Sequence, residues 1–315
     1  MSQPFFSIII PTADRPILLQ KSVASVREQS FSDWELILVD DGKQFRLDNH
    51  ASYLQDERIF IYPVDLASKG GSRNFGISKA RGKYICFLDD DDYYLQDHLD
   101  HFRKAYEVEA NRDKILRAGY LRLQHVKFKE GPFYRDQQYN HPVKFAVYTF
   151  CGIWSLSIPT AYLTENQFNP GLPYWQDTHL LLRLFSKYDL IQLPVYTYVY
   201  RIHNYMGSLQ AFRQLSLQEV TSLNLLAVDD LKSNYRLDLS DVLTNADFGY
   251  LKAKKYLEAA HYSLIYYNGK AFFSYLKSGL RQQISIRFIK TYVILLRDYV
   301  LKKTGLLARN SKPPE

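Results

Sequence analysis

Four consecutive carboxylates, residues 89–92, directly follow the apolar segment 84–88 (YICFL) and are the strongest chemical signal in the chain. Adjacent carboxylates repel one another, and a divalent cation relieves that repulsion because Mg²⁺ and Mn²⁺ prefer carboxylate oxygens. The alternative is a solvated turn that caps a helix at about 95–106. We favour the cation site, because the acids come at the end of a strand-like segment.

Two more polar clusters come after strand-like segments. Residues 11–15 (PTADR) follow the apolar run 5–10, and residues 40–42 (DDG) follow the run 34–39 (WELILV). An Asp-Gly turn is common after a strand, but two acids could also accept hydrogen bonds from a base or a ribose. Because ligands of open α/β sheets bind at the carboxyl ends of the strands, we expect all three clusters in one site.

A glycine-containing segment, residues 69–74 (KGGSRN), precedes a predicted helix at 72–80. Glycine lets a ligand approach the backbone closely, a helix N-terminus favours anions, and Arg73 could hold a phosphate. The alternative is a flexible loop in which Ser72 caps the helix. Such a loop is a weak signal by itself.

Two single residues further along the chain are candidates. Asp177 opens an amphipathic segment at 178–185, where an N-cap is the favoured interpretation of an isolated aspartate. His203 follows a strand-like segment at 195–200, and a lone histidine is more often structural than a ligand. Neither residue indicates a function without the pattern around it.

The elements that must position these residues alternate between strand-like and helix-like patterns. Four apolar runs, the last at 84–88, predict strands that are covered on both faces, with helical periodicity between them. This alternation predicts an α/β fold with a mostly parallel, mixed sheet flanked by helices. Helix-period patterns dominate from about residue 211, so we expect two domains, residues 1–210 and a helical C-terminal region at 211–315.

Composition and charge narrow the function further. The 315 residues are 46% hydrophobic and include two cysteines, which cannot form a disulfide scaffold, so a cytoplasmic setting is expected. No signal peptide and no run of about 18 apolar residues is visible. Residues 270–309 carry nine basic residues and one acid, a charge of +8 within a total of +7, so the rest of the chain sums to −1. A basic charge confined to one segment argues against nucleic-acid binding.

The segment 281–303 predicts a basic amphipathic helix. One face carries Ile284, Phe288, Tyr292, Leu295 and Tyr299, and another carries Arg287, Lys290 and Arg297. This pattern suits the surface of an anionic membrane, which would make the protein peripheral at the inner face of the membrane. Packing on the catalytic domain or on a second subunit is equally favoured, because amphipathicity does not separate the two.

Taken together, the motifs resemble family 2 glycosyltransferases, which are inverting enzymes with the GT-A fold. The matching segments are SIIIPTADRP (7–16), SFSDWELILVDDG (30–42), GGSRNFGISKARGKYICFLDDDD (70–92), WQDTHLLLRL (175–184) and YRIH (200–203). They come in the order of the family and cover about residues 5–205. The chain departs from the family pattern at Ala13-Asp14, at Lys43 and at Gln176.

The resemblance implies a nucleotide-diphosphate-sugar donor, usually a UDP-sugar, held with Mn²⁺ or Mg²⁺. It implies Asp177 as the catalytic base, Asp91 as metal ligand, His203 near the metal or the diphosphate, and Asp89 with Asp91 as the Asp-x-Asp (DXD) motif. The donor-binding candidates are Pro11, Thr12, Arg15, Asp40, Asp41, Gly70, Arg73, Asn74, Asp89 and Asp90.

The sequence therefore predicts an inverting, metal-dependent glycosyltransferase that acts on a glycan or lipid-linked acceptor in surface polysaccharide or other glycan synthesis. Two alternatives stay open. A sugar-nucleotide nucleotidyltransferase would need a glycine-rich loop after the first strand, where this chain has PTADRP. A non-catalytic, membrane-associated nucleotide-sugar-binding protein would not need to retain both Asp91 and Asp177.

Overall fold

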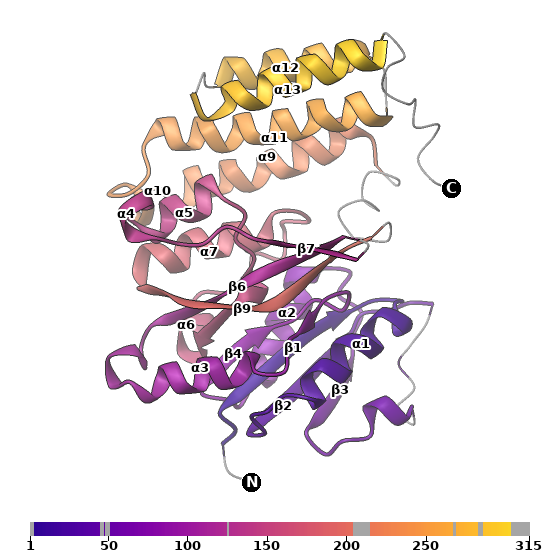
Figure 1. The fold of residues 1–315 in the computed structure, drawn as a ribbon, viewed down its shortest axis with the longest axis vertical. Helices are drawn as coiled ribbons and strands as arrows, with labels where there is room; N and C mark the ends of the chain where they lie inside the picture. The colour runs from indigo at the N-terminus through magenta and orange to yellow at the C-terminus, as the bar shows by residue number, and fades with distance from the viewer. Residues whose placement is uncertain are drawn as a thin grey trace. The chain divides into compact units, whose positions relative to one another are not determined.

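The computed structural model describes residues 3–44, 47, 51–124, 126–203, 215–266, 269–282 and 286–303. The chain divides into two units, Met1–Asn204 and Tyr205–Glu315, which are described separately (Figure 1). The predicted boundary near residue 210 falls outside the described residues.

A mixed sheet with helices on its faces forms the N-terminal unit (Figure 1). Its strands are β1 (Phe6–Thr12), β2 (Trp34–Asp40), β3 (Ile59–Pro63), β4 (Tyr84–Phe87), β5 (Tyr93–Tyr94), β6 (Ile115–Gln124), β7 (Lys127–Glu130), β8 (Leu156–Pro159) and β9 (Leu190–Ile202). The strand order is β3-β2-β1-β4-β8-β6-β9-β5, with β7 paired to β6. The ladders among β1 to β4 are parallel, as is β6 with β9, whereas β8 runs antiparallel to both of its neighbours. The predicted α/β class is confirmed.

The strands predicted as continuous apolar runs are the central ones. All seven residues of β2 are buried, and six of the seven in β1 are. Helices that connect parallel strands cover both faces of such a sheet, which is why the runs show no alternation. The helices are α1 (Pro16–Arg27), α2 (Lys69–Lys79), α3 (His98–Glu107), α4 (Asp136–Tyr139), α5 (Pro142–Tyr148), α6 (Thr160–Glu165) and α7 (Gln176–Lys187), with short 3-10 turns at Ser52–Leu54, Glu109–Asn111 and Ile153–Ser155.

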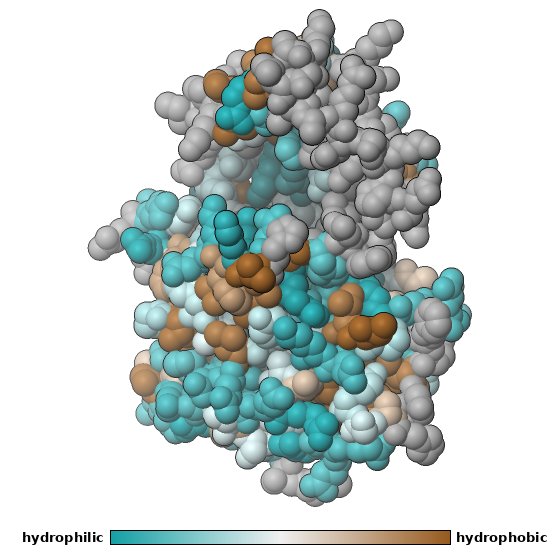
Figure 2. Space-filling model, turned by 45° about the vertical axis from the view of Figure 1, so that its right-hand side comes forward, coloured by the Kyte–Doolittle hydropathy of each residue, from teal (hydrophilic) through white to brown (hydrophobic). Residues whose placement is uncertain are grey.

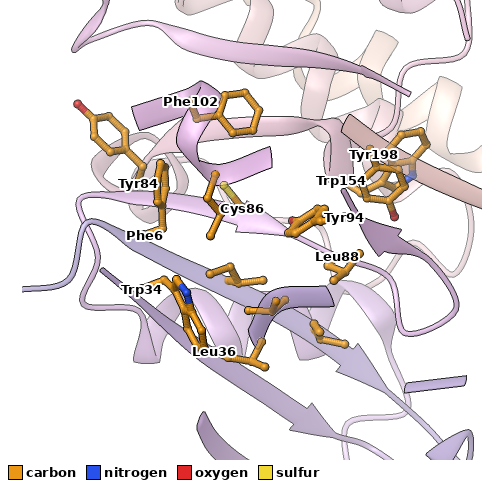
Figure 3. Packing of buried hydrophobic residues seen from close by; sticks show 14 of the residues in the cluster. Phe6, Trp34, Leu36, Tyr84, Cys86, Leu88, Tyr94, Phe102, Trp154 and Tyr198 are labelled. Carbon is orange, nitrogen blue, oxygen red and sulfur yellow. The ribbon is translucent and has the colours of Figure 1, made fainter. Parts of the chain in front are cut away.

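The core on one face of the sheet runs from the N-terminal strands to the aromatic residues of the second half (Figure 3). Phe6, Trp34 and Tyr84 lie at one end of it, and Trp154 stacks on Tyr198 at the other, with ring centroids 4.2 Å apart. The segment 111–174 is rich in aromatic residues, and several of them, including Tyr134, Phe145 and Phe168, are buried and contribute to packing.

The C-terminal unit is helical in its described residues. It contains α9 (Leu217–Asn234), α10 (Arg236–Leu239), α11 (Asn245–Tyr266), α12 (Gly269–Gln282) and α13 (Ile286–Lys303). Ser216 and Glu219 form a reciprocal capping box at the start of α9. The predicted helix 281–303 corresponds to the end of α12 and all of α13, with residues 283–285 outside the described part. None of the described helices combines the length and apolar character of a membrane span.

Candidate functional site

A pocket opens where the carboxyl ends of β1, β2 and β4 meet the start of α2. Its lining consists of Pro11, Thr12, Ala13, Arg15, Asp41, Lys69, Ser72, Asp89 and Asp90. Parallel pairing fixes this arrangement, because Thr12 at the end of β1 lies opposite Asp40 at the end of β2. The structure thus brings the three polar clusters of the sequence to one edge of the sheet, as the strand-end rule for open α/β sheets predicts.

The acidic segment 89–92 is held in place by Arg15, which immediately precedes α1, and by hydroxyl groups of β1 and α1. Arg15 Nη1 lies 3.1 Å from Asp90 Oδ1 and 2.9 Å from Asp91 Oδ2. The Thr12 hydroxyl donates to Asp90 Oδ2 at 2.9 Å, and the Ser22 hydroxyl donates to backbone carbonyl oxygens of the same segment. The segment is therefore a built turn with fixed carboxylates, and the alternative of a merely solvated turn is wrong.

Arg73 joins the acidic segment to Asp177. Its Nη1 donates to Asp177 Oδ1 at 2.6 Å and its Nη2 donates to Asp89 Oδ1 at 2.9 Å. The Arg73 side chain is 4% exposed, so the guanidinium is buried between two carboxylates. A buried cation is tolerated when it is paired and hydrogen-bonded in this way, and the pairing sets the position of Asp177 relative to the acids.

Asp177 reaches Arg73 because of how α7 begins. Trp175, the residue before the helix, has a left-handed backbone with φ 62°, which is uncommon for a residue other than glycine. The N-cap is Trp175 and the helix starts at Gln176, so Asp177 lies in the first turn. The interpretation of Asp177 as an N-cap is therefore wrong, and its carboxylate pairs with Arg73 instead.

The start of α2 positions the pocket's other wall. Ser68 caps the helix by accepting from the Gly71 amide at 3.1 Å, so the alternative of a loop capped by Ser72 is wrong. Asp41 accepts from the Leu66 amide at 2.7 Å and from the Ser72 hydroxyl at 3.1 Å. Its carboxylate thus ties the end of β2 to the turn that precedes α2.

The last strand supplies the remaining contacts to the acids. Tyr198 donates to Asp92 Oδ2 at 2.6 Å, and the Arg201 amide donates to Asp92 Oδ1 at 2.7 Å. His203 Nε2 lies 3.3 Å from Asp91 Oδ2. His203 is expected here only from the family resemblance, and Asp92 and Arg201 were not among the predicted site residues.

Burial and charge shift the acids in opposite directions. Burial raises the pKa of Asp90 to about 6 despite the Arg15 charge. Burial also raises the pKa of Asp177; Arg73 opposes that shift and the negative charge of Asp89 adds to it. The pKa of Asp91 is lowered, because hydrogen bonding to His203 and the Arg15 charge together outweigh burial. An aspartate with a raised pKa binds a proton more readily, which suits a general base.

Four of the predicted donor-binding residues are not in the pocket lining: Arg73, which bridges Asp89 and Asp177, and Asp40, Asn74 and Gly70. Asp40 is buried and accepts from the Gly42 and Leu47 amides. Asn74 exchanges two hydrogen bonds, both 2.9 Å, with the backbone of Phe168. Gly70 lies between pocket residues but faces Gln176, which a Cβ atom would approach to 3.0 Å. The structure gives each of these residues a local structural function.

Three lining residues were not among the candidates: Ala13, Lys69 and Ser72. Lys69 and Ser72 stand in the segment KGGSRN, where only Gly70, Arg73 and Asn74 were assigned to the donor. The signal that could have found them is helix periodicity, because positions three apart face the same side of α2.

The acidic segment also has the chemistry of a cation site. Asp89, Asp91 and Asp92 each offer a carboxylate oxygen, and these oxygens lie within 4.8 Å of one another. Hard oxygen ligands suit Mg²⁺ and Mn²⁺, and the nearby imidazole of His203 is compatible with Mn²⁺. The donor set therefore fits the divalent cation that the sequence predicts.

Comparison with known proteins agrees with this geometry. Residues 7–154 match the model of the family described as glycosyl transferase family 2, which confirms the resemblance. A GalNAc(5)-diNAcBac-PP-undecaprenol beta-1,3-glucosyltransferase of Campylobacter jejuni is 28% identical over 297 residues, 90% of each chain. WcaA of Escherichia coli K12, a glycosyl transferase named for colanic acid biosynthesis, is 36% identical over 203 residues, which are 64% of this chain and 59% of WcaA.

Solved structures share the fold. Staphylococcus aureus TarS 1–349, in complex with UDP-GlcNAc, superposes with a TM-score of 0.58 at 16% identity over 94% of this chain and 80% of that one. The mannosyltransferase PcManGT of Pyrobaculum calidifontis, in complex with GDP-Man and Mn²⁺, gives a TM-score of 0.51 at 14% identity over 99% of this chain and 89% of that one. The fold is that of GT-A glycosyltransferases, as predicted.

Proposed function

We propose, from the premise that this protein is a glycosyltransferase with a family 2 domain, that it moves a sugar from a nucleotide diphosphate, most simply UDP, to a hydroxyl group of a lipid-linked glycan. The transfer is metal-dependent and inverts the anomeric configuration. We assign it to the N-terminal region, residues 1–210. The single observation that carries the proposal is the Arg73 bridge, which places Asp177 one guanidinium away from Asp89 at the pocket wall.

The pocket supports a nucleotide-sugar donor. Asp41 lines the pocket after β2. Its carboxylate, which accepts from Leu66 and Ser72, would accept a further hydrogen bond from a base. Lys69 brings a positive charge to the pocket wall at the N-terminus of α2, a place that favours the phosphates of the donor. Relatives point the same way, since TarS binds UDP-GlcNAc and PcManGT binds GDP-Man with Mn²⁺.

The acceptor hydroxyl is a poor nucleophile unless a base removes its proton. We assign that step to the Asp177 carboxylate, whose burial raises its pKa and so strengthens it as a base. The acceptor oxygen bonds to the anomeric carbon while the bond from that carbon to the diphosphate breaks, and the electron pair leaves with the diphosphate. A divalent cation held by Asp91, with Asp89 and His203 beside it, would stabilise the negative charge on the leaving diphosphate.

Arg73 acts in this scheme as a positioning residue. Both of its terminal nitrogens donate to carboxylates, so the guanidinium fixes the Asp177 carboxylate relative to Asp89, a residue of the pocket lining. It also keeps the candidate base ionised, because a paired guanidinium favours the charged form of a carboxylate. Contact of Arg73 with the donor, which the resemblance implies, stays a prediction.

The lipid-linked acceptor is supported by the Campylobacter relative, whose name gives an undecaprenol-diphosphate-linked glycan as its substrate. The match covers 90% of this chain and 90% of that protein. A membrane-bound acceptor would bring the protein to the inner face of the membrane as a peripheral protein.

The test of the proposal is nucleotide binding with and without metal. Isothermal titration of UDP, with GDP as the matched control, should show binding that needs Mn²⁺ or Mg²⁺ and prefers UDP. Asp91→Ala should remove the metal dependence and weaken UDP by about tenfold or more, since a carboxylate–metal–diphosphate contact is lost. Unchanged UDP affinity with Mn²⁺ in Asp91→Ala would contradict the metal site. A panel of nucleotide sugars, followed by release of nucleoside diphosphate, then identifies the donor.

A further inference from the structure

Helix α13 carries apolar residues on two different faces. Tyr292 and Leu295 are buried in the C-terminal unit, and the Tyr299 ring stacks on Phe272 of α12 with centroids 5.2 Å apart. The face that the sequence suggested for a membrane is therefore the packed one in its described part. A second apolar face is exposed: Val293, Leu296 and Val300 are 60%, 42% and 56% exposed.

Helix α12 repeats the same arrangement. Phe272 and Leu276 are buried, whereas Phe273 and Leu280, seven residues apart on one face, are 45% and 38% exposed. The Phe273 ring contacts the Tyr299 ring at 4.8 Å between centroids, so the exposed apolar row of α12 adjoins α13. Apolar side chains are visible at the surface of the C-terminal unit in Figure 2. Apolar residues that packing alone requires would be buried, so this double row indicates a binding surface.

Basic side chains lie beside the exposed rows. Lys277 and Arg281 are exposed on α12 next to Phe273 and Leu280, and Arg297 is exposed on α13 next to Val293. Asp298 is the one acid in residues 270–309. It pairs with Arg297 at 2.6 Å and therefore neutralises one of the nine basic charges. The surface therefore combines apolar side chains with a net positive charge.

We propose that α12 and α13 together bind an anionic lipid bilayer in its plane, with the exposed apolar rows entering the boundary between headgroups and acyl chains. Lys277 and Arg281 meet the lipid phosphates, because polybasic segments are attracted to anionic leaflets. A second copy of the chain fits less well, since an isologous contact would set the same basic residues against each other. The inference takes its purpose from the proposed lipid-linked acceptor, but the contact stands on these exposed residues.

The test is flotation of the full-length protein with phosphatidylcholine vesicles and with vesicles that contain phosphatidylglycerol. We expect the protein to float with the anionic vesicles and not with the neutral ones. Lys277→Glu with Arg281→Glu, and separately Leu296→Glu with Val300→Glu, should each lower the partition coefficient by about tenfold or more. Leu237→Glu is the matched control, because Leu237 on α10 is 88% exposed and lies outside the surface.

Two outcomes overturn the inference. One is equal flotation of the wild type with neutral and anionic vesicles, or none with either. The other is a dimer in size-exclusion chromatography that dissociates in the Leu296→Glu, Val300→Glu variant while flotation is unchanged, which would assign the surface to a second copy. UDP binding measured on the same variants separates the two proposals: the variants should bind UDP as the wild type does, and flotation without any UDP binding would overturn the proposed function alone.

Discussion

The site at the sheet edge and the exposed surface of α12 and α13 both contain clustered charges. The charges of the first are paired with one another, whereas among the described residues of the second Arg297 pairs with Asp298. At the sheet edge, Arg15 lies between Asp90 and Asp91, and Arg73 lies between Asp177 and Asp89. On α12, the basic residues Lys277 and Arg281 face outward. Internal pairing fixes the position of a group, whereas unmatched exposed charge acts on whatever approaches from outside. The first arrangement suits catalysis and the second suits binding to a large charged partner.

The largest expected effect comes from Asp177, the proposed base, which pairs with Arg73. Asp177→Asn keeps the shape of the side chain but removes its basicity, so sugar transfer should fall by about 10²–10⁴-fold while UDP affinity is kept. Transfer is measured by product formation from the donor that the nucleotide-sugar panel identifies, and UDP affinity by calorimetry. Asp113→Asn, at a side chain that is 67% exposed, is the matched control. Turnover close to that of the wild type would remove Asp177 from the catalytic role.

A smaller effect tests the cost of burying charge in the same site. The pKa of Asp90 is raised to about 6, so between about pH 4 and pH 6 the folded state holds more protons than the unfolded state. Stability should therefore fall as the pH rises through that window and stay lower above it. In the presence of EDTA, Asp90→Asn should unfold at a higher urea concentration than the wild type at pH 8, and the gain should vanish near pH 4. A gain that is independent of pH would contradict this assignment.

The smallest effect concerns the exposed charges of the C-terminal unit. Lys277→Gln should change the free energy of unfolding by less than about 0.5 kcal/mol, because an exposed lysine contributes little to stability. Urea unfolding followed by circular dichroism measures it, with Ser278→Ala on the same helix for comparison. A loss above about 1 kcal/mol would mean that this charge has a partner inside the protein, and the contrast between the two regions would weaken.

The N-terminal half of the fold was predictable because its signals are local. The buried runs of β1, β2 and β4 are uninterrupted, and polar residues mark the end of each strand. The second half of the fold was not predictable in this way. Strand β8 has four residues, which leave little pattern in the sequence, and it pairs antiparallel with both β4 and β6. The aromatic residues of this half did not indicate the strand arrangement either. The stacking of Trp154 on Tyr198 depends on a contact between segments that are distant in the sequence.

The candidate site likewise contains residues that local sequence signals predict and contacts that they do not. Residue types at strand ends indicated Thr12, Arg15, Asp41, Asp89 and Asp90, all of which line the pocket. The sequence could not show that both terminal nitrogens of Arg73 donate to carboxylates, because Asp177 is 104 residues away along the chain. Nor could it show that Asn74 fastens the backbone of Phe168, since an amide next to a glycine-rich turn suits a ligand equally well.

Gly70 marks a close contact between α2 and the start of α7. An alanine there would bring its methyl group to 3.0 Å from the Gln176 side chain and 3.3 Å from Phe168. Helix α2, whose first turn borders the pocket, and helix α7, which carries the proposed base Asp177, therefore touch through a position with no side chain. The spacing of the two helices is set at this contact, so a side chain at residue 70 should shift α7, and with it the proposed base, away from the pocket.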